Sequence, residues 1–317
     1  MENRLVPAAG FPLHLIRIGA LNKVNLRTRL KTFSDLPASV LDSRRILSES
    51  RPDVVIGVGG YASGPVMMAA ILRRIPTLVF EPNYVPGFAN RLVARWVSGA
   101  AVHFEETGRY FRRCEVTGVP VRQAFFDIPR RTFGDGPQTL LVFGGSQGAH
   151  AINEVVRHSV AALRARIPEI RVIHQTGERD FNDAEVTYSG LGNWVEAHRF
   201  IDDMPGFFAR ADLLLCRSGA STVAEITAAG RPAIFVPFPH AADDHQKRNA
   251  EALARAGAAI LLEESELRPE SFIETVSSLL GNPPVLNEMG EAAKARSHPN
   301  AANDIATMAA RLAGMSR

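Results

Sequence analysis

Short hydrophobic runs alternate with segments of helical periodicity along most of the chain. The runs are predicted to be buried strands, because they are short, apolar and followed by turn residues. The predicted strands cover residues 52–57, 77–80, 101–104, 139–143, 172–175, 212–216, 233–236 and 258–262. Strands that alternate with helices predict parallel sheets with helices on both faces. We therefore predict an α/β protein.

Two of the predicted helices have clear apolar faces. The helix that follows the run 139–143 carries apolar residues on one face, namely Ile152, Val155, Val156 and Leu163. A break at residues 298–300 precedes the last predicted helix, whose apolar face consists of Ile305, Met308, Ala309 and Leu312. Both patterns are typical of amphipathic helices.

The chain is long enough for two domains. Its 317 residues exceed one ordinary domain, for which ~150 residues is typical. The stretch 121–138, between the two series of strands, is rich in Pro, Gly and Arg and lacks periodicity, which predicts an interdomain linker. Residues 1–7 show neither the strand nor the glycine-rich turn with which a doubly wound domain normally opens.

Composition narrows the class of protein further. Hydrophobic residues make up 46% and charged residues 22%, the balance of a globular protein. The net charge of +3 is too small to indicate nucleic-acid binding, although it suits anionic small molecules or an anionic membrane surface. Cys114 and Cys216 lack metal-ligand spacing and fit a reducing compartment. No apolar run approaches the ~20 residues that span a bilayer.

Glycine-rich turns follow three of the predicted strands, at residues 57–60, 144–149 and 216–225. The helix after such a turn begins with unpaired N–H groups, and its dipole favours anions such as phosphate. For any single turn, an equally good interpretation is that glycine only permits a tight connection. None of the turns continues as the Gly-Lys-Ser/Thr of a P-loop, and a clean dinucleotide fingerprint is missing.

Side chains in these turns suit a nucleotide diphosphate. Ser146 offers a hydroxyl to a phosphate oxygen, and Glu225 stands at a helix start, where a carboxylate can accept both ribose hydroxyls. Alternatively, residues 222–225 form a capping box. The polar stretch 240–249 follows another strand and predicts a sugar-reading loop, since its two histidines lack the arrangement of a metal site.

A series of short motifs relates the chain to a known family. The motifs are GGYASGP at 59–65, EPN at 81–83, GVPVR at 118–122, GGSQGA at 144–149, FIDDM at 200–204, CRSGA at 216–220 and PFPH at 237–240. Through these motifs, in this order, the whole chain closely resembles the MurG family of bacterial UDP-N-acetylglucosamine transferases.

The resemblance implies a GT-B fold, in which two Rossmann-like, doubly wound domains face a cleft. It implies an acceptor and membrane-side domain at residues 1–122, here without its first strands, and a UDP-sugar domain at residues 123–300. The last helix, within residues 301–317, would return to the first domain.

The resemblance also implies which residues bind the donor, UDP-N-acetylglucosamine. Ile201 would read the uracil through its backbone, Ser146 would meet a phosphate, and Glu225 would hold the ribose. The other implied donor contacts are Asn83, Arg122, Ala220, Ser221, Thr222, Val223, Ala224 and Gln246.

The family reaction transfers N-acetylglucosamine, with inversion, to the 4-hydroxyl of lipid I, an undecaprenyl-linked muramyl pentapeptide. The product is lipid II, a precursor of peptidoglycan. Helix N-termini near Ser146 and Ser221 would stabilise the departing UDP, so neither a metal nor another cofactor is demanded. No convincing general base is present in the sequence, and the catalytic residue is left unassigned.

A lipid acceptor in the inner leaflet implies peripheral attachment to the cytoplasmic face of the plasma membrane. Within residues 23–33, one helical face carries Leu26, Leu30 and Phe33 with basic residues around them, which fits an interfacial anchor. An ordinary surface helix that docks on its own domain explains the pattern at least as well.

Two departures from the family pattern limit these expectations. The family's first glycine-rich loop, which resembles the acceptor diphosphate site and holds a candidate catalytic histidine, does not occur. Two strands would therefore be missing between the segment 12–18 and the strand 53–57, and we expect the chain as written to be poorly stable or inactive, with its true start upstream. Phe80 and Pro82 stand where many relatives carry histidine and glutamine, so neither serves proton transfer.

Three other functions are left open by the sequence. One is a different GT-B enzyme that uses a UDP-sugar, such as an epimerase or a glycolipid synthase. Another is a remnant that binds a UDP-sugar without turnover. The weakest is a nicotinamide oxidoreductase, because the dinucleotide fingerprint is missing.

Overall fold

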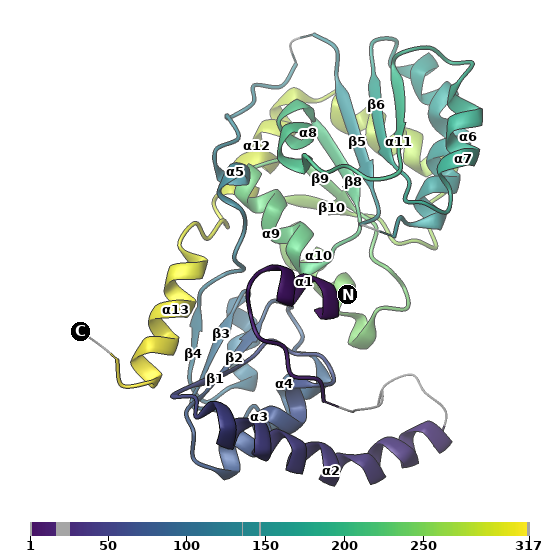
Figure 1. Ribbon diagram of the computed structural model, residues 1–317. Helices are drawn as coiled ribbons and strands as arrows, with labels where there is room; N and C mark the ends of the chain where they lie inside the picture. Colours follow the sequence, from purple (N-terminus) through teal and green to yellow (C-terminus); the bar gives the residue numbers. More distant parts are fainter. Residues whose placement is uncertain (1, 17–25, 135, 146, 316–317) are drawn as a thin grey trace. The chain divides into compact units, whose positions relative to one another are not determined.

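Two parallel sheets, each covered by helices, organise the chain (Figure 1). The computed structural model describes residues 2–16, 26–134, 136–145 and 147–315, and of residues 2, 4 and 26–37 it describes the backbone alone. The chain divides into two compact units. The first comprises residues 1–82, 86–117 and 303–317, and the second comprises residues 83–85 and 118–302.

The first unit is built around a four-stranded parallel sheet in the order β1-β2-β3-β4. Its strands are β1 (Val55–Gly57), β2 (Thr77–Glu81), β3 (Gly99–Val102) and β4 (Cys114–Val116). Its helices are α1 (Glu2–Ala8), α2 (Leu26–Ser50), α3 (Ser63–Leu72), α4 (Phe88–Val93), the 3₁₀ helix η1 (Glu105–Tyr110) and α13 (Ala301–Leu312).

Helices cover both faces of this sheet. Val79 of β2 lies in an apolar cluster with Leu47 of α2 and Met67 of α3. The next residue toward the N-terminus, Leu78, points to the other face and lies in a cluster with Met308 of α13. Successive side chains of a strand point to opposite faces, so the uniformly apolar run predicted for residues 77–80 reflects a strand that is buried on both sides.

The second unit contains a six-stranded parallel sheet in the order β10-β9-β8-β5-β6-β7. Its strands are β5 (Thr139–Phe143), β6 (Arg171–Gln175), β7 (Val195–His198), β8 (Leu213–Cys216), β9 (Ala233–Phe235) and β10 (Ala259–Leu261). Its helices are α5 (Gln123–Phe126), α6 (His150–Arg166), α7 (Phe181–Tyr188), α8 (Met204–Arg210), α9 (Ala220–Ala229), the 3₁₀ helix η2 (Ala242–Asp244), α10 (His245–Arg255), α11 (Pro269–Leu280) and α12 (Pro283–Lys294).

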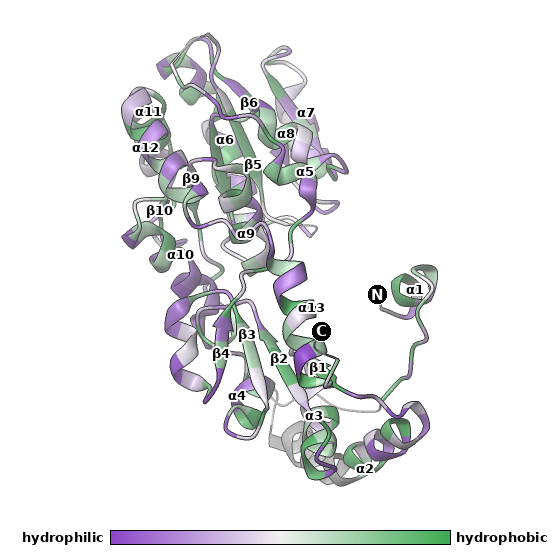
Figure 2. Ribbon diagram, turned by 90° about the vertical axis from the view of Figure 1, so that its left-hand side faces the viewer, coloured by the Kyte–Doolittle hydropathy of each residue, from purple (hydrophilic) through white to green (hydrophobic). Residues whose placement is uncertain are grey.

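The central strand β5 is also buried on both faces, and Figure 2 shows it in the green of hydrophobic residues. Leu140 and Val142 belong to the large cluster that includes Ile152 and Val156 of α6, as the apolar face of this helix predicts. Phe143 packs on the other side against Phe208 of α8, with ring centroids 5.7 Å apart. The predicted α/β class with parallel sheets is confirmed.

The hydrophobic pattern located most strands but missed two. Each of the predicted runs overlaps an observed strand, although 101–104 begins two residues after the start of β3 at Gly99. The pattern missed β4, whose residues are all exposed, and β7, of which only Val195 is buried. Within the segment 12–18, the described residues 12–16 form no strand.

The stretch 121–138, predicted to be an interdomain linker, is attached to the second unit. This stretch contains α5 and belongs to the second unit. The side chain of Arg231, itself 2% exposed, donates to the Pro129 carbonyl at 3.2 Å and to the Phe208 carbonyl at 2.9 Å. Burial lowers the pKa of Arg231 to about 10. The buried Arg231 side chain thus joins the stretch 121–138 to α8, because it donates to a carbonyl group in each of them.

Candidate functional site

The strand order of the second unit creates a position where a ligand can bind. From β5 the chain continues to β6 and β7 on one side of the sheet, and then crosses to β8 on the other side of β5. Because β5 and β8 are parallel neighbours, their carboxyl ends lie at the same edge. The turns that follow the two strands lead away in opposite directions. The place where the strand order reverses in this way is called the switch point, and in open α/β sheets ligands bind there.

The turn after β5 is held in one conformation by a neighbouring turn. Gly148 has a φ of +73°, and a Cβ there would lie 1.9 Å from the carbonyl oxygen of Thr176. Gly145 has a φ of +85°, and a Cβ there would meet nothing within 4 Å. Helix α6 begins directly after the turn, at His150, so its first N–H groups face the switch point. Ser146 lies outside the described residues.

The turn after β8 leads into α9. Its N-cap is Gly219, without a side-chain cap, and the helix begins at Ala220. Thr222 therefore lies inside the first turn, and the capping-box interpretation of residues 222–225 is wrong. The buried Ser218 donates its hydroxyl to the Gln246 carbonyl at 2.8 Å. The predicted donor residues 220–225 thus form the beginning of a helix whose N-terminus points to the switch point.

Glu225 and Arg122 are brought together by the fold. Glu225 is half-buried in α9, and burial raises the pKa of its carboxyl group while the positive charge of Arg122 acts in the opposite direction. Arg122 stands at the N-cap of α5, and its guanidinium lies 5.2 Å from the centre of the Phe125 ring. A carboxylate that burial partly desolvates is a strong acceptor for hydroxyl groups that can replace the lost water.

Asn83 and Ser218 are connected by Asn249, which lies at the end of the polar stretch 240–249. The buried Asn249 of α10 donates to the side-chain oxygen of Asn83 and to the Ser218 carbonyl, both at 3.2 Å. Asn249 also accepts the N–H of Tyr84 at 2.9 Å. The side-chain oxygen of Gln246 accepts the N–H of Phe238 at 3.0 Å. Asn249 shares the buried side of α10 with Ala252 and Leu253, three and four residues later, and a polar residue at such an apolar position is the sequence signal that could have found it.

Ile201 lies in the segment after β7 and is 4% exposed. Its N–H donates to the side-chain oxygen of Gln175 at 2.9 Å. The amide nitrogen of Gln175 in turn donates to the Gly145 carbonyl at 3.0 Å. Ile201 is therefore connected to the turn after β5 through a single side chain. In the described ranges, no group of three or more His, Cys, Asp and Glu side chains could hold a metal ion.

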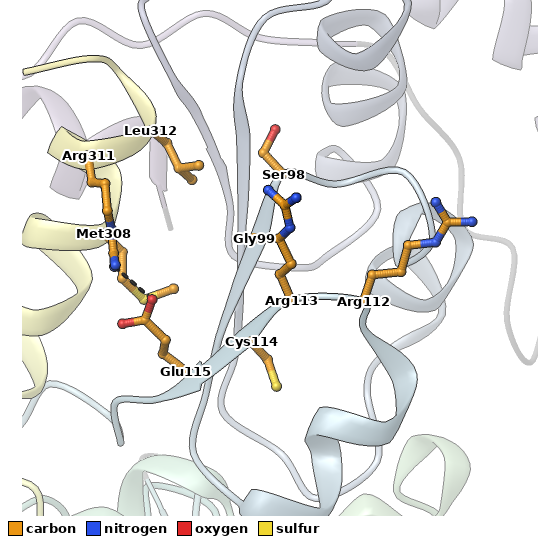
Figure 3. A pocket seen from close by; sticks show the side chains of 9 residues that line it. All are labelled: Ser98, Gly99, Arg112, Arg113, Cys114, Glu115, Met308, Arg311 and Leu312. Atoms are coloured by element: carbon orange, nitrogen blue, oxygen red, sulfur yellow. Dashed lines mark hydrogen bonds and ion pairs between the residues drawn. The ribbon is translucent and has the colours of Figure 1, made fainter.

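A cavity of about 630 Å³ lies elsewhere, within the first unit (Figure 3). It is lined by residues of β3, β4 and α13 and of the segments directly before the two strands: Ser98, Gly99, Arg112, Arg113, Cys114, Glu115, Met308, Arg311 and Leu312. The Arg311 guanidinium contacts the Glu115 carboxylate at 2.7 Å. The cavity contains none of the predicted donor residues, so it is separate from the candidate site.

The ion pair beside this cavity is expected to contribute little to stability. The side chains of Arg311 and Glu115 are 55% and 51% exposed, and such surface pairs contribute less than about 1 kcal/mol. Glu115→Gln should therefore change the free energy of unfolding, measured with urea, by less than about 1 kcal/mol. A loss above about 2 kcal/mol would mean that the ion pair, rather than the apolar contacts of Met308, holds α13 on the sheet.

Comparison with known proteins identifies the family. Residues 139–305 match the model of the glycosyltransferase family 28 C-terminal domain, and residues 1–102 match that of the N-terminal domain. The chain belongs to glycosyltransferase family 28.

Individual relatives indicate which members of this family the chain is similar to. A relative from Solibacter usitatus is named UDP-N-acetylglucosamine–N-acetylmuramyl-(pentapeptide) pyrophosphoryl-undecaprenol N-acetylglucosamine transferase, and is 47% identical over 95% of this chain and 82% of its own length. A relative of the same name from Myxococcus xanthus is 41% identical over 96% and 81%. The crystal structure of MurG from Acinetobacter baumannii has a TM-score of 0.80 and 32% identity, over 98% of this chain and 88% of that one. The predicted MurG resemblance and GT-B fold are confirmed, and the chain is a hexosyltransferase.

Proposed function

We propose that this chain transfers N-acetylglucosamine from UDP-N-acetylglucosamine to lipid I, forming the lipid II used in peptidoglycan synthesis. The observation that carries the proposal is the 47% identity, over 95% of the chain, to a transferase named for this reaction. The second unit supports the proposal, because the turns after β5 and β8 meet at a switch point, and Glu225, Arg122 and Ile201 belong to the same unit.

In the proposed reaction, the 4-hydroxyl oxygen of the acceptor bonds to the anomeric carbon of the sugar as the bond to the β-phosphate oxygen breaks. Configuration inverts, and UDP leaves with the electron pair. The N-termini of α6 and α9 stabilise the negative charge on the departing diphosphate. The hydroxyl proton passes to a general base, which we leave unassigned.

Three groups recognise the uridine in this proposal. The N–H of Ile201 is already donated to Gln175, which leaves the Ile201 carbonyl to accept the N–H of uracil. Glu225 accepts the ribose hydroxyls, and the positive charge of Arg122 partly offsets the rise in the pKa of Glu225 that burial causes. Ser146 is proposed as a phosphate ligand on the family motif alone. Asn83, Gln246 and the backbone of residues 220–224 complete the proposed donor site.

Peripheral attachment to the inner face of the plasma membrane is part of the proposal, because the acceptor is a lipid. None of the helices that the structure describes combines the length and hydrophobicity that a membrane-spanning segment needs. The predicted anchor at residues 23–33 lies outside the described side chains and stays a prediction.

The proposed function can be tested in an assay with the purified chain. The assay contains lipid I in detergent and UDP-N-acetylglucosamine that is labelled in its sugar. The proposed function predicts that the label moves to the lipid fraction with release of an equal amount of UDP, a result that would overturn the expectation from the sequence that the chain as written is inactive. Conversion of the UDP-sugar without lipid I would indicate an epimerase instead. Binding of UDP without any transfer, under conditions in which a relative from the same family is active, would favour a non-catalytic remnant and contradict the proposal.

A further inference from the structure

Gln175 ends β6, the strand that lies between β5 and β7 in the sheet. The residue is 1% exposed, so its polar side chain is entirely enclosed by the protein. Burial of an amide side chain is unfavourable unless both its donor and its acceptor are used. Gln175 uses both, and each partner is a backbone group in the segment that follows a different neighbouring strand.

The two hydrogen bonds connect the two parts of the proposed nucleotide site. On one side, the Gln175 amide donates to the Gly145 carbonyl at 3.0 Å, in the turn proposed to bind the diphosphate. On the other side, its oxygen accepts the N–H of Ile201 at 2.9 Å, in the segment proposed to read the base. The Gly145 carbonyl also accepts the N–H of Gly148 at 3.0 Å, which closes the turn.

Backbone packing next to Gln175 restricts the same region. Thr176 donates its N–H to the His198 carbonyl at 2.9 Å, which joins the end of β6 to the end of β7. A Cβ on Gly177 would lie 2.7 Å from the Gly148 nitrogen, so the turns after β5 and β6 touch through their backbones. The Gln175 side chain therefore forms a hydrogen-bonded bridge between two segments that backbone contacts already bring close.

We propose that Gln175 is a positioning residue of the donor site, which fixes the distance between the diphosphate-binding turn and the uracil-reading segment. This inference rests on the proposed donor site. By holding both segments in place before the ligand arrives, Gln175 lowers the ordering cost of binding a uridine diphosphate. Its bond to Ile201 also leaves the carbonyl of that residue as the group that selects a base with an N–H at the matching position.

The chemistry of the side chain gives a test that a merely structural role would not pass. A glutamate at position 175 keeps the size and the acceptor, but its ionised form cannot donate to the Gly145 carbonyl. Its protonated form can donate and accept, as the amide does. Because burial raises the pKa of a carboxyl group, Gln175→Glu should recover as the pH falls.

The experiment measures the Kd of UDP by calorimetry at pH 6 and pH 8 for the full chain and three variants. At pH 8, Gln175→Glu should weaken UDP binding about tenfold or more, the loss expected for one hydrogen bond to a buried carbonyl. At pH 6 the defect should shrink severalfold. Gln175→Ala should bind weakly at both pH values, because alanine provides neither group.

Gln138→Glu is the matched control. Gln138 directly precedes β5 at the opposite edge of the same sheet, and its amide donates to the Leu280 carbonyl. The same chemical change there should leave the Kd of UDP unchanged, whatever it does to the melting temperature. Melting curves of all variants check that the measured protein is folded at the temperature of the titration.

The outcomes separate this inference from the proposed function. If the wild-type chain does not bind UDP, the donor site itself is wrong. If the wild-type chain binds UDP, and folded Gln175→Ala and Gln175→Glu bind it equally well, the positioning role alone is refuted. A Gln175→Glu defect of the same size at pH 6 and pH 8 would also refute it, because the missing donor would then not be the cause.

Discussion

Replacement of Gly148 by alanine is expected to remove measurable sugar transfer and to lower the free energy of unfolding by about 2–5 kcal/mol. Two costs add. The new Cβ would lie 1.9 Å from the Thr176 carbonyl oxygen, so one of the two turns must move. In addition, the φ of +73° is a conformation that alanine adopts only with strain. Because the displaced turn is the proposed diphosphate site, binding of the donor is lost together with stability.

Urea unfolding and UDP titration of this variant measure both effects, and Gly145→Ala is the control. Gly145 lies in the same turn with a φ of +85°, but a Cβ there meets nothing within 4 Å. Only the conformational cost of about 1–2 kcal/mol should apply to it. Equal destabilisation by the two substitutions would show that contact with Thr176 does not restrict the turn.

Glu225→Gln is expected to weaken UDP binding about 10- to 100-fold and, at neutral pH, to make the protein more stable. The first effect follows from the loss of a charged acceptor for the ribose, which contributes roughly 1.5–3 kcal/mol. The second effect follows from burial, which raises the pKa of Glu225 above its ordinary value of 4.5. The folded protein therefore binds this proton more tightly than the unfolded chain does.

The sign of the pH dependence follows from that shift. Well below pH 4.5 the carboxyl group is neutral in both states, so the substitution gains nothing from this source. As the pH rises through the raised folded pKa, the wild-type protein loses stability that the glutamine variant keeps. Melting temperatures of both proteins between pH 4 and pH 8 should therefore diverge toward higher pH, with the variant above. A gap that closes toward high pH would contradict the burial of an ionised Glu225.

The ribose contact has its own control. 2′-Deoxy-UDP should bind the wild-type chain more weakly than UDP does, because one hydroxyl of the ribose is missing. The Glu225→Gln variant should discriminate less between the two ligands, since the group that reads the hydroxyl has lost its charge. Equal discrimination by both proteins would place the ribose away from Glu225.

The fold was predictable from sequence wherever a strand is buried on both faces. Leu140, Val142 and their neighbours in β5 form an uninterrupted apolar run, and the structure places a strand at the predicted residues 139–143. The exposed edge strand β4 and the half-exposed strand β7 have no such run and were missed. The composition of the stretch 121–138 is typical of a linker and does not reveal its attachment to the second unit. Its attachment depends on Arg231, about a hundred residues later in the chain.

The residues of the candidate site were predictable only in part, because local sequence patterns do not show contacts between distant parts of the chain. Glu225 was predictable because it follows a turn rich in glycine and hydroxyl groups, although the structure places it in the second turn of α9 rather than at the helix start. Ile201 is predicted by a family motif. Gln175 and Asn249 act through partners distant in sequence, such as Gly145 and Asn83. Gln175 belongs to no local pattern beyond its strand. Asn249 lies in the polar stretch 240–249 and on the buried side of α10, but its partners follow only from the fold.

Hydrogen–deuterium exchange with and without UDP tests the central claim most directly, namely that the donor site lies at the β5–β8 switch point of the second unit. We predict that UDP slows exchange in the turn after β5, in the segment around Ile201 and in the first turns of α9, while β4 and α13 beside the cavity of the first unit are unchanged. Slowed exchange confined to β4 and α13, or absent from all three predicted segments, would contradict the account.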